Sequence, residues 1–349
     1  MKKHLGFAIA ALLVALLVSC TQYVYWPIYD YNEDNNTNNV SVIGTDIADG
    51  VYVVGVDSVL PVTVSYSNGT SRTIMVPADV INAAVGTETG VRTLSITYDG
   101  VTFAVDVYIP ASDDVASDPN YINTAEKLTS LFTNTSGTEK IAVLADSFNI
   151  GNNNGYYIKD LSNIHIYSTD PSNTLTVTGI TSSETAMYFH GGSNITLEGF
   201  TIKDGNPDSG TTKPLFKANG TTNLVLKDMR FETNQRGLDI HGNTDTSIIN
   251  CTITKASLNY GELQIRKANG MIVDGLTIED KEGTSNIGII MFDDGINDSP
   301  EISKNVVLSN LHNVDTIMAL KDVGVTVNDD NMIPSEMGNY VIYTNQGLV

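Results

Sequence analysis

Basic and imidazole side chains recur at one position of a repeating segment in the second half of the chain. Aligning the copies gives Lys159, His190, Lys217, His241, Arg266 and Lys321 at this position, with a break near Phe292 or Asp293. A second outward position beside it carries Tyr157, Tyr188, Asp239 and Gln264. A row of cations can hold carboxylates or sulfates, and aromatic rings can stack on a ligand. The pattern predicts a binding surface for a polymer that is acidic, and solvated cations on an exposed strand are the simpler alternative.

Some of these residues could also do catalysis. Removing a proton beside a carboxylate needs a cation that acidifies the proton and a base that accepts it. Lys217, His241 and Arg266 are the candidates for these roles. Arg236 and Lys267 lie near them in the alignment, and Lys267 is also a candidate binding residue. The corresponding reaction would be β-elimination in a uronic-acid polysaccharide.

The sequence offers little to hold a metal ion. His190 and His241 fall two repeats apart, about 9.6 Å at the spacing of adjacent strands, which is too far to share a zinc ion bound at about 2 Å by each nitrogen. The acidic run 293–301 contains oxygen ligands of the kind that bind calcium. It lacks the ligand spacing of an EF-hand, so a solvated turn is the alternative. Calcium is the one candidate cofactor.

These positions are set by a segment that recurs between Tyr156 and Val327. The copies align on Ile164, Ile195, Leu224, Thr246, Met271, Val306 and Val325, at intervals of 31, 29, 22, 25, 35 and 19 residues. Each copy consists of short alternating strands separated by polar turns, and side chains alternate between the two faces of a strand. The residues expected to point inward are Met187, Phe189, Leu238, Ile240, Leu263 and Ile265. The repeats indicate a solenoid whose stacked coils bury one apolar column.

The repeats resemble the right-handed parallel β-helix of the pectate-lyase-like superfamily, from about Tyr121 to the C-terminus. The amphipathic segment 124–132 matches the helix that caps the N-terminal end of that fold, and 140–150 matches its first strand. In the polysaccharide-cleaving enzymes of this superfamily, the substrate groove lies over the first strand of each coil. The resemblance therefore implies a polysaccharide ligand, although the same fold also serves adhesins and structural stalks.

The catalytic motifs of that superfamily are incomplete. Alginate and chondroitin lyases carry a Lys in an Asn-Lys-Ser turn and then Leu-Arg-His-Gly, to which only 237–243 and 264–270 correspond distantly. The calcium ligands of pectate lyases are not recognisable on the first strands. Of the polygalacturonase motifs, only the Asp pair at 293–294 and the Asn-Thr-Asp at 243–245 occur. The resemblance therefore supports the fold more strongly than an activity.

Residues 40–110 have a different pattern of alternating strands. An Asn-Gly at 68–69 and an Asp-Gly at 99–100 each separate two alternating runs, which predicts two hairpins. Short strands with regular turns are typical of a β-sandwich, and the segment resembles bacterial Ig-like domains, which are usually spacers in surface proteins. Residues 111–120 are expected to link this module to a β-helix at 121–349, so the predicted fold class is all-β.

The first nineteen residues have the features of an export signal. A basic start precedes an apolar stretch, Leu5 to Val18, that is too short to span a membrane comfortably. Leu17-Val-Ser-Cys20 resembles a bacterial lipobox, which implies cleavage before Cys20 and attachment of lipid to its sulfur and amine. The residue after this Cys is Thr21 and not Asp, which, by resemblance to bacterial lipoproteins, favours sorting to the outer membrane. Residues 20–39 are predicted to be a disordered tether.

Charge and cysteine content limit the partners further. The chain has 19 Lys and Arg against 40 Asp and Glu, a net charge of −21, and loss of the signal segment with its two Lys would make it −23. This argues against nucleic acid, because phosphate binding needs clustered cations. Cys251 occupies the inward position that Phe200, Leu276 and Leu311 hold in other coils, so it is predicted to be a buried apolar residue.

Together these features predict an exported, lipid-anchored surface protein with an Ig-like spacer and a β-helix that binds a polysaccharide or another surface ligand along its first strands. A polysaccharide lyase that uses Lys217, His241 and Arg266 is the enzymatic alternative. A purely structural or adhesive surface protein is the third interpretation.

Overall fold

The computed structural model describes residues 40–47, 50–133, 139–151, 156–178, 185–205, 214–233, 236–254, 262–279, 288–291 and 302–345. The predicted signal segment, Cys20 and the predicted tether lie outside these residues. From Val42 onward, the described residues belong to one compact unit. Within the described part of the chain, we find no helix with the length and apolar character needed to cross a membrane.

The N-terminal module consists of two three-stranded sheets. One has the order β1 (Val42–Ile47), β3 (Val59–Tyr66), β4 (Ser71–Pro77), and the other β2 (Tyr52–Val53), β6 (Val101–Ile109), β5 (Gly90–Tyr98). Both predicted hairpins are present, since β3 pairs antiparallel with β4 and β5 with β6. Val62, Val76 and Val107 belong to one buried core, so the sheets form a small sandwich. The short helix α2 (Ala78–Ala84), which the sequence pattern did not predict, buries Ile81.

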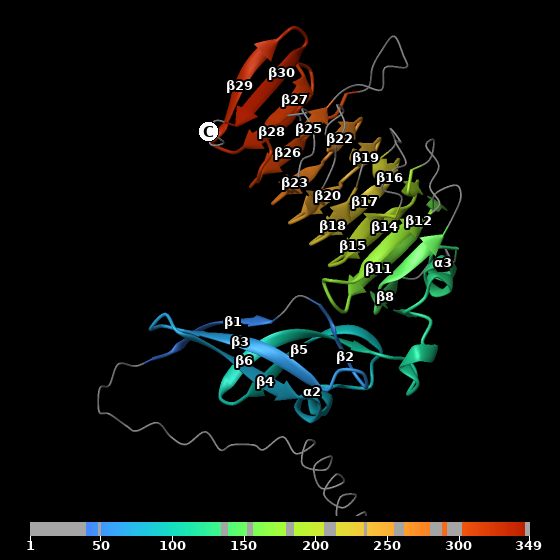
Figure 1. Ribbon diagram of the computed structural model, residues 1–349, viewed down its shortest axis with the longest axis vertical. Helices are drawn as coiled ribbons and strands as arrows, with labels where there is room; N and C mark the ends of the chain where they lie inside the picture. The colour runs from blue at the N-terminus through green and yellow to red at the C-terminus, as the bar shows by residue number, and fades with distance from the viewer. Residues whose placement is uncertain are drawn as a thin grey trace, which may run out of the picture. The chain divides into compact units, whose positions relative to one another are not determined.

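The chain then winds into a parallel β-solenoid with three sheets (Figure 1). The first sheet contains β10 (Tyr156–Lys159), β13 (Met187–His190), β16 (Pro214–Asn219), β19 (Arg236–His241), β22 (Leu263–Arg266), β25 (Ile289–Met291) and β27 (Thr316–Leu320), and then the antiparallel pair β30 (Tyr340–Asn345) and β29 (Met332–Met337). The second contains β7 (Tyr121–Ile122), β8 (Lys140–Leu144), β11 (Ser162–Ser168), β14 (Ser193–Glu198), β17 (Thr222–Lys227), β20 (Ser247–Ile249), β23 (Ile272–Asp274), β26 (Val306–Ser309) and β28 (Val325–Asn328). The third contains β9 (Phe148–Gly151), β12 (Thr174–Thr178), β15 (Thr201–Asp204), β18 (Arg230–Glu232), β21 (Thr252–Thr254) and β24 (Thr277–Glu279). The predicted parallel solenoid is confirmed.

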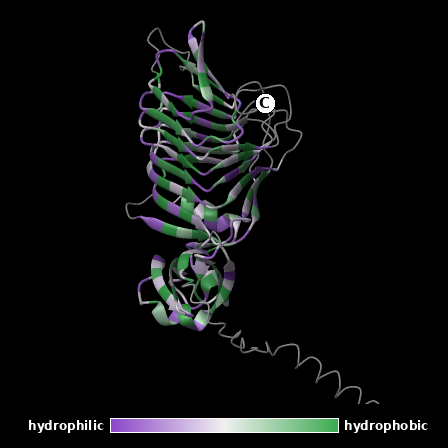
Figure 2. Ribbon diagram, turned by 90° about the vertical axis from the view of Figure 1, so that its left-hand side faces the viewer, coloured by the Kyte–Doolittle hydropathy of each residue, from purple (hydrophilic) through white to green (hydrophobic). Residues whose placement is uncertain are grey.

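The residues on which the repeats align fall in register in the second sheet. Ile164 pairs with Ile195, and Ile195 with Leu224. The pairing of the following strands brings Thr246, Met271, Val306 and Val325 into the same row. The predicted inward positions are also correct, with at most 1% exposure at Met187, Phe189, Leu238, Ile240, Leu263 and Ile265. Figure 2 shows the resulting alternation of hydrophobic and hydrophilic residues along the strands.

Helix α3 (Ala125–Thr133) lies at the start of the solenoid, where the sequence predicts a cap. It buries Leu128, Leu131 and Phe132, and the ring centroids of Phe132 and Phe189 are 5.9 Å apart. The helix thus covers apolar groups that would otherwise be exposed at the end of the stack. The predicted first strand, 140–150, is divided into β8 and β9 because the chain turns a corner between them.

A row of asparagines follows the corner between the first and second sheets. Asn163, Asn194 and Asn223 have φ values of 58°, 55° and 54°, a left-handed conformation that Asn adopts more readily than most residues. Their amides form a ladder, because Asn194 donates from Nδ2 to Asn163 Oδ1 at 2.8 Å and Asn223 donates to Asn194 Oδ1 at 2.9 Å. The ladder fixes one coil above the next and therefore holds the first sheet in register.

Candidate binding face on the first sheet

Two files of side chains lie on the outer side of the first sheet, because their sequence neighbours, such as Met187 and Phe189, point into the core. The first file contains Lys159, His190, Asn219, His241 and Arg266. The second file contains Tyr157, Tyr188, Lys217, Asp239 and Gln264. Neighbours within a file come from adjacent coils, about 4.8 Å apart. We call the two files together the outer face.

The prediction that Lys217 belongs to the first file is wrong. Lys217 pairs with Tyr188 on one side and with Asp239 on the other, so it belongs to the second file. Asn219 takes the predicted place of Lys217 in the first file. The row of basic and imidazole groups is therefore interrupted by an amide in its middle coil.

The sequence contains a signal that assigns Asn219 to the first file. The signal is the type of residue that follows each member of that file. These following residues all have positive φ: Asp160 (54°), Gly191 (71°), Gly220 (68°), Gly242 (65°) and Lys267 (52°). Glycine reaches this conformation without steric cost, so His190-Gly, Asn219-Gly and His241-Gly mark equivalent strand ends. Aligning these dipeptides would have placed Asn219 correctly.

Two other predicted binding residues are not members of either file. Lys267 is itself the left-handed corner residue after Arg266. Lys321 follows the last residue of β27, and its Nζ lies 2.7 Å from Glu336 Oε2. It falls in a turn beyond the strand and was wrongly assigned to the first file. The predicted break at 292–293 lies outside the described residues.

Aromatic side chains occupy the end of the outer face at β10 and β13. Tyr157 is 56% exposed, and its ring centroid lies 5.2 Å from that of Tyr188 and 5.9 Å from that of His190. Asn219 donates from Nδ2 to Tyr188 Oη at 3.1 Å, and the ammonium of Lys217 lies 5.0 Å from the centre of the Tyr188 ring. These contacts fix Tyr188 on several sides, while Tyr157 remains open to solvent.

Charged side chains converge on Asp239 in the following coils. The Asp239 side chain is only 5% exposed. Arg266 donates from Nε to Asp239 Oδ1 at 3.2 Å and from Nη2 to Oδ2, and Lys217 Nζ lies 3.9 Å from Oδ2. A buried carboxylate is unfavourable unless it is paired and hydrogen-bonded. Asp239 therefore stays paired with Arg266 and Lys217, and this pairing holds both cations in place.

His241 of the first file lies between Asn219 and Arg266. Burial lowers the pKa of the His241 imidazole, and the positive charge of Arg266 lowers it further, against the opposing effect of Asp239. The imidazole is therefore neutral near pH 7, with one nitrogen that donates a hydrogen bond and one that accepts. His190, two coils away, has a buried Nδ1 for which the described residues provide no hydrogen-bond partner.

The far end of the second file is closed to solvent. Gln264, a predicted binding residue, is 1% exposed, and Glu262, which directly precedes β22, is 2% exposed. Direct contact of Gln264 with a ligand would thus require a change in its surroundings. The accessible part of the outer face runs from β10 to Arg266, whose side chain is 19% exposed.

We find no metal site in the described part of the chain, since no three or more His, Cys, Asp and Glu side chains there are placed to share an ion. The acidic run 293–301, the predicted calcium candidate, lies outside the described residues. Calcium therefore remains a sequence-based expectation for that run.

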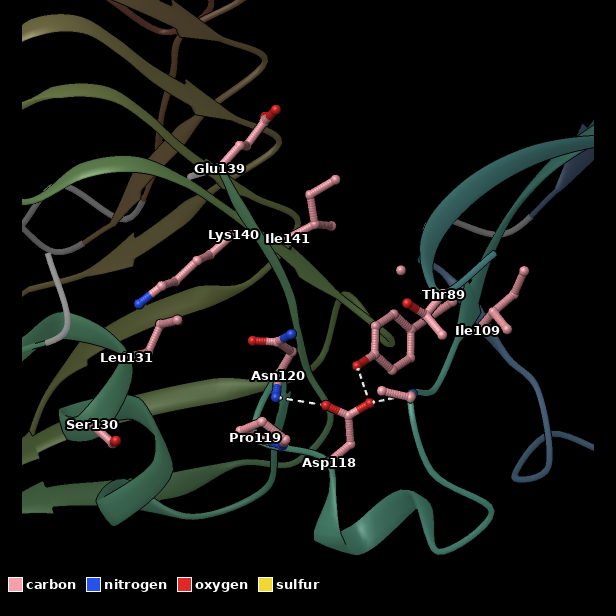
Figure 3. A pocket seen from close by; sticks show the side chains of 13 residues that line it. Thr89, Ile109, Asp118, Pro119, Asn120, Ser130, Leu131, Glu139, Lys140 and Ile141 are labelled. Carbon is pink, nitrogen blue, oxygen red and sulfur yellow. Dashed lines mark hydrogen bonds between the residues drawn. The ribbon is translucent and has the colours of Figure 1, made fainter. Parts of the chain in front are cut away.

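A cavity of about 480 Å³ lies between the sandwich and the start of the solenoid (Figure 3). Asp118 in its wall is 1% exposed, and its carboxylate accepts hydrogen bonds from the Tyr108 hydroxyl at 2.8 Å and from the backbone N–H groups of Ala111 and Asn120 at 2.7 and 2.9 Å. The ammonium of Lys127 donates to three backbone carbonyls of the same linker region. These groups connect the linker to both modules, so we assign them a structural role.

Comparisons with known proteins assign neither a family nor an activity to the chain. No family model and no curated protein matches the chain. A candidate glycosyl hydrolase from Parabacteroides merdae ATCC 43184 is 10% identical, with a TM-score of 0.37, and the match covers 59% of this chain and 90% of that one. PfbA, a surface adhesin of Streptococcus pneumoniae, is 13% identical, with a TM-score of 0.42, over 58% of this chain and 56% of that one. Similarity this distant assigns no activity to the chain.

Proposed function

We propose that this chain is a surface-anchored polysaccharide-binding protein and that the outer face is its binding site. The proposal depends on one observation, the exposed Tyr157 in register with Tyr188 and with the polar side chains of the next coils. Aromatic rings provide apolar surface for a sugar ring, and a few fixed polar groups can bond to its hydroxyls. Because similar positions recur about every 4.8 Å along the stack, the face suits an extended ligand.

The binding proposal can be tested with the soluble protein from residue 40 onward, which contains the compact unit. A glycan array identifies ligands, and isothermal titration calorimetry measures their affinity. Tyr157→Ala should weaken binding about tenfold, a loss of roughly 1.4 kcal/mol, because it removes the exposed ring. Tyr157→Phe should retain binding, and Tyr98→Ala in the sandwich is the matched control. Equal affinities for the wild type and Tyr157→Ala would rule out this face.

We also propose that the mature protein is anchored through lipid on Cys20, with the sandwich as an Ig-like spacer at the bacterial outer membrane or cell surface. Leu17-Val-Ser-Cys20 at the end of an apolar stretch supports the anchor. In bacteria supplied with radiolabelled palmitate, the wild type should incorporate label and Cys20→Ser should not. Labelling of both proteins to the same extent would contradict the anchor.

A polysaccharide lyase is the second candidate function, and the surroundings of His241 favour it. A neutral imidazole can remove the proton beside a uronate carboxylate, while the Arg266 guanidinium stabilises the negative charge that develops. The electron pair of the broken C–H bond forms a C=C bond as the glycosidic C–O bond breaks, and the leaving sugar oxygen takes up a proton. Lys217, the third predicted catalytic residue, lies on the other side of Asp239 from Arg266.

The lyase alternative has a direct assay. The protein is incubated with alginate, pectate, chondroitin and heparin, and unsaturated product is followed by its ultraviolet absorbance. A lyase should produce absorbance that His241→Ala abolishes. Silence on all four substrates removes this candidate. If the glycan array is also blank, the structural or adhesive interpretation is the one that remains.

A further inference from the structure

We propose that the polysaccharide bound by the outer face is neutral and not a polyanion. The inference rests on the proposed binding function and specifies its ligand. It departs from the acidic ligand predicted from the sequence, because that prediction placed Lys217 between His190 and His241 in the row of basic and imidazole groups. The structure interrupts the row at Asn219 and places a carboxylate, Asp239, within the second file.

The main cations of the outer face already lie against carboxylates of the protein. Arg266 makes two hydrogen bonds to Asp239, and Lys217 Nζ lies 3.9 Å from the same carboxylate. At the other end, Lys159 Nζ lies 3.9 Å from Asp160 Oδ2. An anionic sugar approaching Arg266 would meet Asp239 beside it and would have to compete for both N–H groups. The pairing of Arg266 with Asp239 is stronger than a pairing of Arg266 with a sugar carboxylate, because the Asp239 pairing is bidentate and largely removed from water.

The other groups of the outer face are suited to hydroxyls. The Asn219 amide and a neutral His241 can each donate and accept hydrogen bonds, as sugar hydroxyls do. Tyr157 and Tyr188 supply apolar ring surface, which is indifferent to ligand charge. At longer range, the chain's net charge of −21 opposes the approach of a polyanion.

Two panels of polysaccharide distinguish the outcomes. The protein from residue 40 onward is titrated with neutral chains (laminarin, mannan, xyloglucan) and acidic chains (polygalacturonate, alginate, heparin) at roughly 20 and 500 mM NaCl, across which charge interactions become screened. We expect binding to a neutral chain with less than about a twofold change in affinity between the two salts. Binding confined to acidic chains, with affinity falling at high salt, would overturn this inference and leave the binding function intact. Binding to neither panel would overturn both.

Removing the protein's own carboxylates provides the matched variants. Asp239→Asn should create binding to acidic chains at roughly 20 mM NaCl that is lost at roughly 500 mM, because it releases the Arg266 guanidinium from its ion pair. Asp160→Asn is the second variant should the first fail to fold, because Asp160 is exposed and Asn tolerates its positive φ. Asp99→Asn, at an equivalent left-handed position in the sandwich, is the control. If the wild type binds acidic chains, and Asp160→Asn and Asp239→Asn bind them no more tightly than the wild type does, the inference is refuted.

Discussion

Replacing Phe216 with alanine tests whether the stacked coils share one tightly packed core. Phe216 is fully buried on β16, and its ring centroid lies 5.4 Å from that of Phe189 and 5.7 Å from that of Phe231. Phe231 belongs to the same coil as Phe216 and Phe189 to the preceding coil, so removal of the ring leaves a cavity inside one coil and against its neighbour. Buried Phe-to-Ala changes cost about 3–5 kcal/mol, and we expect a value in this range for the free energy of unfolding.

Urea unfolding of the protein from residue 40 onward, followed by far-ultraviolet circular dichroism, gives this free energy. Tyr157→Ala is the control on the same sheet, because it removes an aromatic side chain from the solvent side and should cost no more than about 1 kcal/mol. Because each coil contacts mainly its neighbours, Phe216→Ala should also broaden the transition as the solenoid separates into two halves. A loss below about 1 kcal/mol for Phe216→Ala, equal to that of the control, would refute the packing described here.

Three further outcomes are expected. Gly192→Ala should sharply lower the urea midpoint, because φ is +84° and the new Cβ would lie 1.8 Å from a backbone oxygen; an unchanged midpoint would contradict this. Burial raises the pKa of Glu198, but hydrogen bonds from His165 and Lys227 outweigh burial and lower this pKa below the ordinary 4.5. The ionised carboxylate therefore stabilises the fold above pH 4.5, and this stabilisation is lost as the pH falls through the lowered pKa. Glu198→Gln should therefore be less stable than the wild type near pH 7 and lose less on acidification, and parallel pH profiles would argue against it. Burial raises the pKa of the Cys251 thiol to about 12, so a thiol reagent should label it only in urea; rapid labelling of the native protein would contradict its burial.

The solenoid was predictable because its strands are amphipathic and its coils repeat. Ile164, Ile195 and Leu224 could be matched by their polar turns, and they pair as the alignment predicts. The intervals between them differ, since insertions fall at corners and leave the strand pattern unchanged. Alternation within a strand then determines which side chains are buried.

The composition of the outer face was harder to predict because strand length varies between coils. β16 begins at Pro214 and contains six residues, whereas β13 contains four. Alternation shows on which face of the strand Lys217 lies, but it does not show its position along the strand. Two positions that are two residues apart lie on the same face, so the alternating pattern cannot distinguish them. The ion pair between Asp239 and Arg266 could not be found either, since it depends on which residues of adjacent coils are partners.

The N-terminal module shows the same contrast. Its hairpins follow from Asn-Gly and Asp-Gly turns, which specify register locally. The role of Asp118 has no local signal, because its partner Tyr108 lies in a strand of the sandwich and the contact exists only once the modules are folded. The all-β fold could thus be predicted, but the polar contacts that join its parts could not.

The position of Lys217 beside Tyr188, and not beside His190, determines which groups face a ligand, and engineered disulfides test it directly. Partners on adjacent strands have Cα atoms about 4.8 Å apart, within disulfide range, whereas a pair offset by two residues is about 8 Å apart, which is too far. After mild oxidation of the protein from residue 40 onward, the double variant Tyr188→Cys/Lys217→Cys should form an intramolecular disulfide, seen by mass spectrometry. His190→Cys/Lys217→Cys should stay reduced. Disulfide formation in the second pair and not in the first would contradict the register and, with it, the proposed binding face.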